Sequence, residues 1–69
     1  MAVVFEEIEP ALTRISLRSK TPRIDVNQIA KQFGGGGHTS AAGAHIPGPP
    51  LSVQRRVLAA VKKALEASR

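Results

Sequence analysis

The sequence contains no cysteine, tryptophan or tyrosine, and its only phenylalanines are Phe5 and Phe33. Without cysteine the chain can form neither a disulfide framework nor a thiolate zinc site, and a reducing compartment suits it. Without tryptophan or tyrosine it lacks the usual stacking platforms for single-stranded nucleic acid. It also has no membrane-length apolar run and no signal-peptide pattern at its start. We therefore expect a cytoplasmic protein that does not bind a membrane.

Acidic residues are also scarce. Asp25 is the only aspartate, and the four glutamates lie near the two ends of the chain, at Glu6, Glu7, Glu9 and Glu66. A two-metal hydrolase site needs several clustered oxygen and imidazole ligands, and a carboxylate acid/base pair needs two convergent carboxylates. We therefore expect no metal site, no bound cofactor and no catalytic residue within this chain.

Basic residues are abundant by comparison. Ten lysines and arginines against five acids give a formal net charge of +5, which favours an anionic partner. The alternative is that these residues only solvate helix faces. With 69 residues, the chain has room for a single domain over residues 1–69.

The first third of the chain has strand patterns. Residues 2–9 are β-branched and aromatic at first and then alternate, and residues 12–19 alternate more clearly. In the second run Ile15 and Leu17 point to one side, while Arg14, Ser16 and Arg18 point to the other. Since Pro10 lies between the two runs, we predict a hairpin with one basic, hydroxyl-bearing face.

Two helices follow from capping and periodicity. Asp25 is a good N-cap, and an apolar stripe at helical spacing consists of Val26, Ile29, Ala30 and Phe33. Gly34 supplies the left-handed residue that ends this helix. After the stiff connector 47–50, Ser52 is the predicted N-cap of a final helix to about Ala67. Its predicted core side comprises Val53, Val57, Val61, Ala64 and Leu65, and its other faces carry Arg55, Arg56, Lys62, Lys63 and Arg69.

The glycine run 34–37 ends at His38. Glycine amides can curl closely around an anion, and a short helix over residues 38–42 would add its own free N–H groups. The run fits neither the G-x-G-x-x-G fingerprint nor a P-loop, because no third glycine or Gly-Lys-[Ser/Thr] falls in register. We predict a phosphate-binding corner, with a flexible linker as the alternative. His45, on a short strand 44–46, is only a weak ligand candidate.

These elements predict an α+β fold. The expected architecture is a small mixed sheet of about three or more short strands, including the hairpin, packed by two main helices. A third, short helix is expected after the glycine-rich loop.

Three segments together resemble a known family. They are Ser16-Leu17-Arg18-Ser19, then 25–30 (DVNQIA), then Phe33-Gly34-Gly35-Gly36-Gly37-His38 with Ala41-Ala42-Gly43. Over nearly the whole chain they are similar to the C-terminal, substrate-binding domain of the DHH-family phosphoesterases. Within the family, the combination looks most like the bacterial oligoribonuclease, or nanoRNase, that also dephosphorylates 3′-phosphoadenosine 5′-phosphate.

The resemblance implies that hydrolysis takes place on an N-terminal catalytic domain, with an Asp-His-His motif and manganese, that is absent from this chain. This domain would grip a short RNA or a nucleoside bisphosphate. The residues implied in substrate contact are Ser16, Arg18, Ser19, Gly35, Gly36, Gly37, His38 and Thr39. A cyclic dinucleotide phosphodiesterase, the tRNA-binding appendage of an alanyl-tRNA synthetase, and a general nucleic-acid-binding module using the basic final helix are the alternatives.

Overall fold

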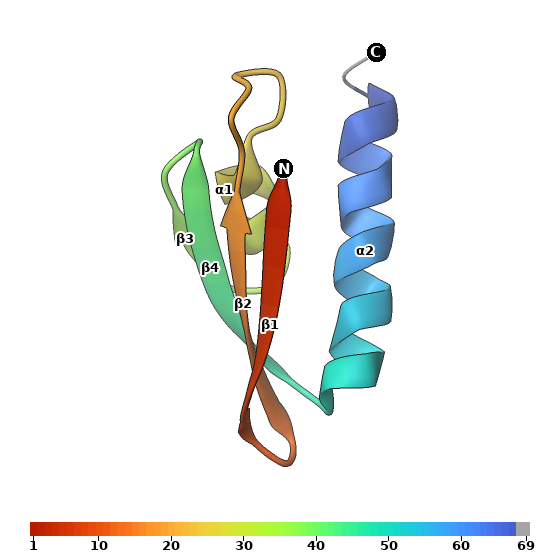
Figure 1. Ribbon diagram of the computed structural model, residues 1–69. Helices are drawn as coiled ribbons and strands as arrows, with labels where there is room; N and C mark the ends of the chain where they lie inside the picture. The colour runs from red at the N-terminus through yellow and green to blue at the C-terminus, as the bar shows by residue number, and fades with distance from the viewer. Residues whose placement is uncertain (68–69) are drawn as a thin grey trace.

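The computed structural model describes residues 1–67 and has the α+β architecture expected from the sequence (Figure 1). Its strands are β1 (Ala2–Glu9), β2 (Leu12–Arg18), β3 (Gly36–Gly37) and β4 (Ala41–Pro47). Its helices are α1 (Val26–Lys31) and α2 (Pro50–Ala67). The strands form one sheet in the order β1-β2-β4-β3, and every pair is antiparallel, so the sheet is not mixed as we predicted.

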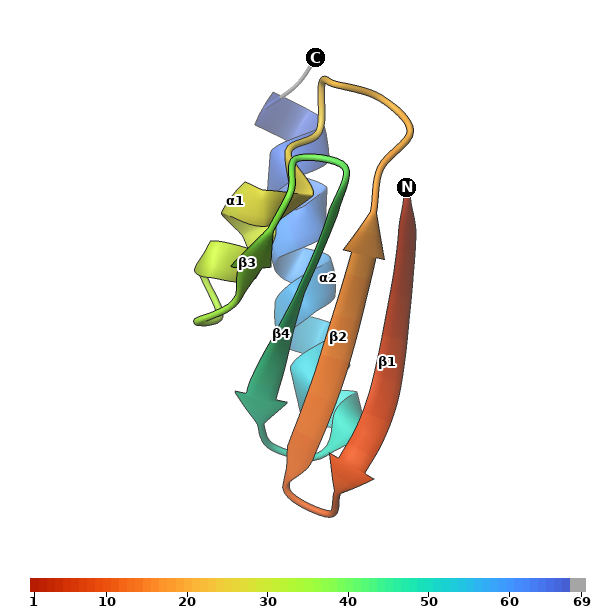
Figure 2. The same cartoon turned by 90° about the vertical axis from the view of Figure 1, so that its left-hand side faces the viewer.

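Both helices lie against one face of the sheet, as Figure 2 shows with the sheet toward the viewer and the helices behind it. The predicted hairpin is confirmed, with β1 and β2 joined at residues 10–11. Ile15 and Leu17 of β2 are fully buried under the helices, whereas Arg14, Ser16 and Arg18 are exposed. The alternation that predicted the strand therefore also sets which face of the sheet is free.

Helix α1 begins directly after Asp25, as the sequence indicated, but it ends at Lys31, before the predicted stop at Gly34. The Asp25 side chain accepts hydrogen bonds from the backbone N–H groups of Asn27 and Gln28, and Val26, Ile29 and Ala30 are buried. Gly34 adopts a left-handed φ of 82° just after the helix. Because a helix of six residues has little stability of its own, these local interactions and its buried face maintain it.

The cap of α1 gives a direct test of this account. Replacing Asp25 by alanine removes the acceptor of two hydrogen bonds of 2.9 and 3.3 Å and is expected to lower the free energy of unfolding by about 1 kcal/mol. Asp25→Asn keeps an acceptor oxygen, so its free energy of unfolding should fall much less. Urea unfolding followed by circular dichroism measures both variants. Equal midpoints for Asp25→Ala and wild type would contradict the capping role.

The predicted helix over residues 38–42 is wrong, because this segment turns into strand β4. His38 and Ala41 exchange both backbone hydrogen bonds, at 2.8 and 3.2 Å, so Thr39 and Ser40 form a tight two-residue turn. From Ala41 onward the chain pairs with β2 along the full length of β4. A five-residue helix is too short to be stable alone, while pairing satisfies the backbone of the whole strand.

The beginning of α2 also differs from the prediction. The helix starts at Pro50 and not after Ser52, and its first internal hydrogen bond runs from Val53 N–H to the Pro49 carbonyl. Proline suits the first helical position because that residue needs no N–H donor. Val53, Val57 and Val61 are buried and Ala64 is partly buried, as predicted, but the Leu65 side chain is 45% exposed. Arg69 lies outside the described residues.

Candidate functional site

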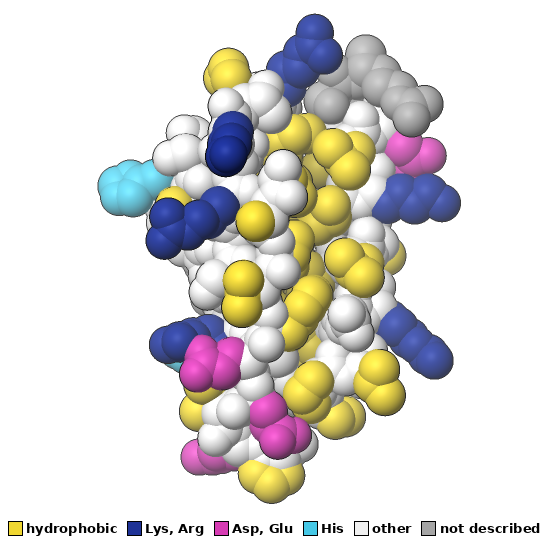
Figure 3. Space-filling view, in the orientation of Figure 1, with side chains coloured by type: hydrophobic (Ala, Val, Ile, Leu, Met, Phe, Trp, Pro, Cys, Tyr) yellow, Lys and Arg dark blue, Asp and Glu magenta, His cyan; other side chains and the backbone are white. Residues whose placement is uncertain are grey.

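The sheet face opposite the helices carries the predicted contact residues Ser16 and Arg18, and we call it the outer face. Its side chains come from β2, at Arg14, Ser16 and Arg18, and from β4, at Ala41, Gly43 and His45. Figure 3 shows Lys, Arg and His side chains projecting from the side of the molecule away from α2. Because no helix covers this face, it is open to a ligand.

Strand register arranges this face in three rows. Arg14 lies opposite His45, Ser16 opposite Gly43, and Arg18 opposite Ala41. The edge strand extends two of the rows, since Gly36 lies opposite Gly43 and His38 is hydrogen-bonded to Ala41. Successive rows are about 7 Å apart along the strands, because each residue of an antiparallel strand rises about 3.4 Å.

The row at the end of the sheet brings together Arg18 and His38. Since each strand lies about 4.8 Å from its neighbour, the backbones of these two residues are about 10 Å apart across β4. Both are exposed, and Arg18 shares a surface depression with Lys20. Thr39 lies beside His38 in the exposed turn. Long cationic and imidazole side chains at this separation can converge on one phosphate.

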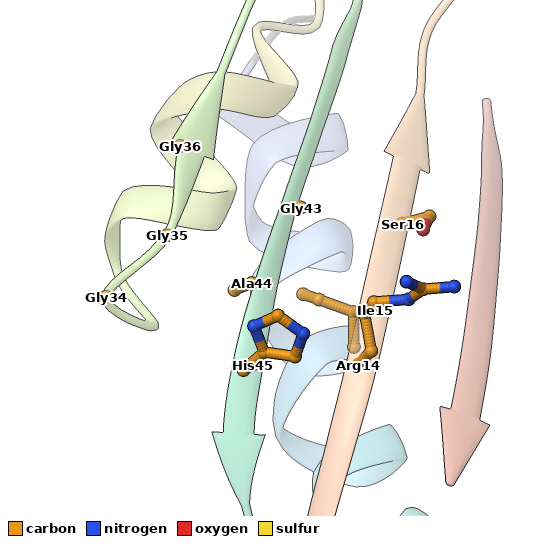
Figure 4. A pocket seen from close by; sticks show the side chains of 9 residues that line it. All are labelled: Arg14, Ile15, Ser16, Gly34, Gly35, Gly36, Gly43, Ala44 and His45. Carbon is orange, nitrogen blue, oxygen red and sulfur yellow. The ribbon is translucent and has the colours of Figure 1, made fainter. Parts of the chain in front are cut away.

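A hollow of about 400 Å³ lies next to that row, and we call it the glycine hollow. It is lined by Arg14, Ile15, Ser16, Gly34, Gly35, Gly36, Gly43, Ala44 and His45. In Figure 4 the His45 ring projects from β4 toward β2, while the Arg14 side chain extends away from it toward β1. Arg14 forms an ion pair with Glu6 on β1. The structure therefore places Ser16, Gly35 and Gly36 together, with His45 at the rim.

The glycine run does not form the open cradle of amides that we predicted. Three of its N–H groups and that of His38 donate within the chain: Gly34 to the Lys31 carbonyl, Gly35 to the Ala30 carbonyl, Gly37 to the Asn27 side chain and His38 to the Ala41 carbonyl. No helix starts at His38, so the expected helix dipole is absent there as well. The cradle is wrong because the end of α1 and the sheet edge already satisfy these donors.

Close packing explains Gly35 and Gly37 instead. A Cβ atom at Gly35 would lie 2.1 Å from the Gly43 carbonyl oxygen, and one at Gly37 would lie 2.6 Å from the Ala41 carbonyl oxygen. Asn27 fastens this segment to α1, because its side-chain oxygen accepts from the Gly37 N–H at 3.0 Å. The role of Asn27 was not predicted, because an amide in a short helix carries no distinguishing signal in the sequence.

Ser19 differs from the other predicted contacts. It is 9% exposed, and its hydroxyl donates to the Thr21 carbonyl at 2.9 Å and accepts from the Thr21 N–H. The Ser19 N–H donates to the Ser40 carbonyl, which ties the end of β2 to the turn after β3. The hydroxyl is thus occupied within the loop, and Ser19 orders the end of the sheet where Arg18 lies.

This arrangement defines a small α+β domain with a helix-covered core and a free, basic sheet face. A family model described as DHHA1 domain matches residues 1–67. The chain therefore belongs to the DHHA1 domain family, which is consistent with the DHH-associated domain of DHH-family phosphoesterases and supports a hydrolase context. None of the helices within residues 1–67 is long and apolar enough to cross a membrane.

Proposed function

We propose that this chain is the substrate-gripping domain of a DHH-family phosphoesterase. It holds a terminal phosphate and the adjacent nucleotide of a short RNA or of 3′-phosphoadenosine 5′-phosphate. The supporting observation is the row formed by Arg18, Ala41 and His38, which lies at an exposed sheet end beside the glycine hollow. The Arg18 guanidinium donates a two-pronged hydrogen bond to the phosphate, and the His38 imidazole donates another.

The domain contributes to hydrolysis by positioning the substrate. Residues 1–67 contain no group of three His, Cys, Asp or Glu side chains that could hold an ion, and the proposal assigns them no metal. The metal and the bond-breaking residues belong to a catalytic Asp-His-His domain of the same protein, which is the partner of this domain. Fixing a scissile phosphate against that domain replaces a bimolecular encounter with an oriented complex, which can remove several kcal/mol from the barrier.

Titration with 3′-phosphoadenosine 5′-phosphate, followed by amide chemical shifts of the isotope-labelled chain, tests the proposal. We expect the largest shifts at Arg18, Ala41 and His38, and weaker binding as salt is raised, because charge attraction contributes. Parallel titrations with a dinucleotide and with a cyclic dinucleotide compare the affinity of the domain for these substrate classes. Shifts confined to α2, around Arg55 and Lys62, would contradict the proposal and favour a general nucleic-acid-binding module.

A further inference from the structure

The glycine hollow differs chemically from the Arg18 row. Its one arginine, Arg14, is paired with Glu6 and extends toward β1, so its charge is largely offset where the hollow begins. The remaining lining residues are four glycines, together with Ile15, Ser16, Ala44 and His45. A surface with hydrogen-bonding groups and little net charge suits a neutral polar ring better than a second phosphate.

His45 provides the aromatic side chain at the edge of the glycine hollow. The chain has no tryptophan or tyrosine, and both Phe5 and Phe33 pack against the core. His38 lies in the neighbouring Arg18 row, on the far side of β4. Figure 4 shows the His45 ring over the space between β4 and β2, at the edge of the hollow. A planar group that enters the hollow meets this ring.

The dimensions match a nucleotide. Ser16 and Gly43 lie two residues, or about 7 Å, from the Arg18 row, and His45 lies four residues, or about 14 Å, from it. A nucleotide whose 5′-phosphate is held at the Arg18 row is long enough to place its ribose over Gly43 and its base toward His45. The volume of about 400 Å³ falls within the range of small-molecule sites, roughly 300–1,000 Å³.

We infer that the glycine hollow binds the nucleobase of the substrate, with His45 as the residue that contacts the base. The inference rests on the proposed function, because it takes the phosphate to lie at Arg18 and His38. It assigns His45 a binding role that its isolated position in the sequence does not indicate.

Adenosine 5′-monophosphate and ribose 5-phosphate test the inference, because the two ligands share the sugar phosphate and differ by the base. In amide-shift titrations of the 69-residue chain, we expect adenosine 5′-monophosphate to bind about tenfold more tightly, with additional shifts at Gly43 and His45. His45→Ala should remove most of that advantage and leave the affinity for ribose 5-phosphate unchanged. His38→Ala, the matched variant in the phosphate row, should weaken both ligands.

Other results of these titrations would contradict either the inference alone or the proposed function as well. If adenosine 5′-monophosphate and ribose 5-phosphate bind at the Arg18 row with equal affinity, and His45→Ala changes neither affinity, the base-binding inference is wrong. The proposed function would not be affected by that result. Inorganic pyrophosphate is the third probe: if His45→Ala weakens it as much as adenosine 5′-monophosphate, the hollow is an anion site and the inference is wrong. If no ligand shifts the Arg18 row, the proposed function fails and the inference fails with it.

Discussion

Replacing Arg18 by alanine is expected to lower the affinity of the chain for 3′-phosphoadenosine 5′-phosphate about 10- to 100-fold. The variant loses a charge-assisted, two-pronged contact with the phosphate, and hydrogen bonds to charged groups contribute about 1.5–3 kcal/mol. Stability should change little, because the side chain is exposed at the end of β2. Titration followed by amide shifts measures the affinity, and circular dichroism verifies the fold.

Arg55→Ala is the matched control for this experiment. Arg55 is exposed on α2, on the opposite side of the molecule from the outer face, and its removal changes the net charge by the same amount. We expect its effect on affinity to be small and to vanish at high salt. Similar losses in the two variants would show that the ligand responds to overall charge, and Arg18 would then not be a phosphate contact.

Replacing Gly35 by alanine is expected to cause the largest loss of stability, about 3 kcal/mol. The new Cβ would lie 2.1 Å from the Gly43 carbonyl oxygen and 2.5 Å from the Ala44 Cβ, so the glycine segment and β4 must separate. A domain of this size is stabilised by only about 3–10 kcal/mol. Thermal unfolding should therefore shift down by roughly 10–20 °C or be lost altogether.

Gly36→Ala provides the comparison within the same run of glycines. Its Cβ would meet only the Asn27 side-chain oxygen, at 3.3 Å, which a small rotation can relieve. We expect a loss of about 1 kcal/mol or less in thermal unfolding. If Gly35→Ala were no more harmful than Gly36→Ala, the close approach of the segment to β4 would not be what requires glycine at position 35.

Local signals in the sequence predicted the elements that depend on near neighbours. The β1–β2 hairpin, the Asp25 cap and the left-handed Gly34 that follows α1 all involve residues within a few positions of one another. Capping, turn chemistry and hydrophobic period act over that range, so they can be recognised without the fold. The two-residue alternation of apolar and polar side chains along β2 also predicted that Arg18 and Ser16 are exposed.

Distant partners decided the elements that the sequence analysis missed. The segment after His38 combines alanines, which favour helices, with a glycine, and its strand conformation depends on pairing with β2. The same pairing brings His45 opposite Arg14, which is far away in the chain. The hydrogen bonds that the glycine N–H groups donate depend on acceptors in α1, including the Asn27 side chain. None of these partners can be identified from the residues next to the segment.

The sequence by itself thus determined an α+β domain with a basic, exposed strand face, and its motifs pointed to the family that the comparison confirms. The tertiary structure decided why the glycines are needed and which side chains share the outer face. The physical reason is that strand register places residues that are distant in the sequence in one row, as it does for Arg18 and Ala41. Register depends on long-range pairing and burial, which no local pattern specifies.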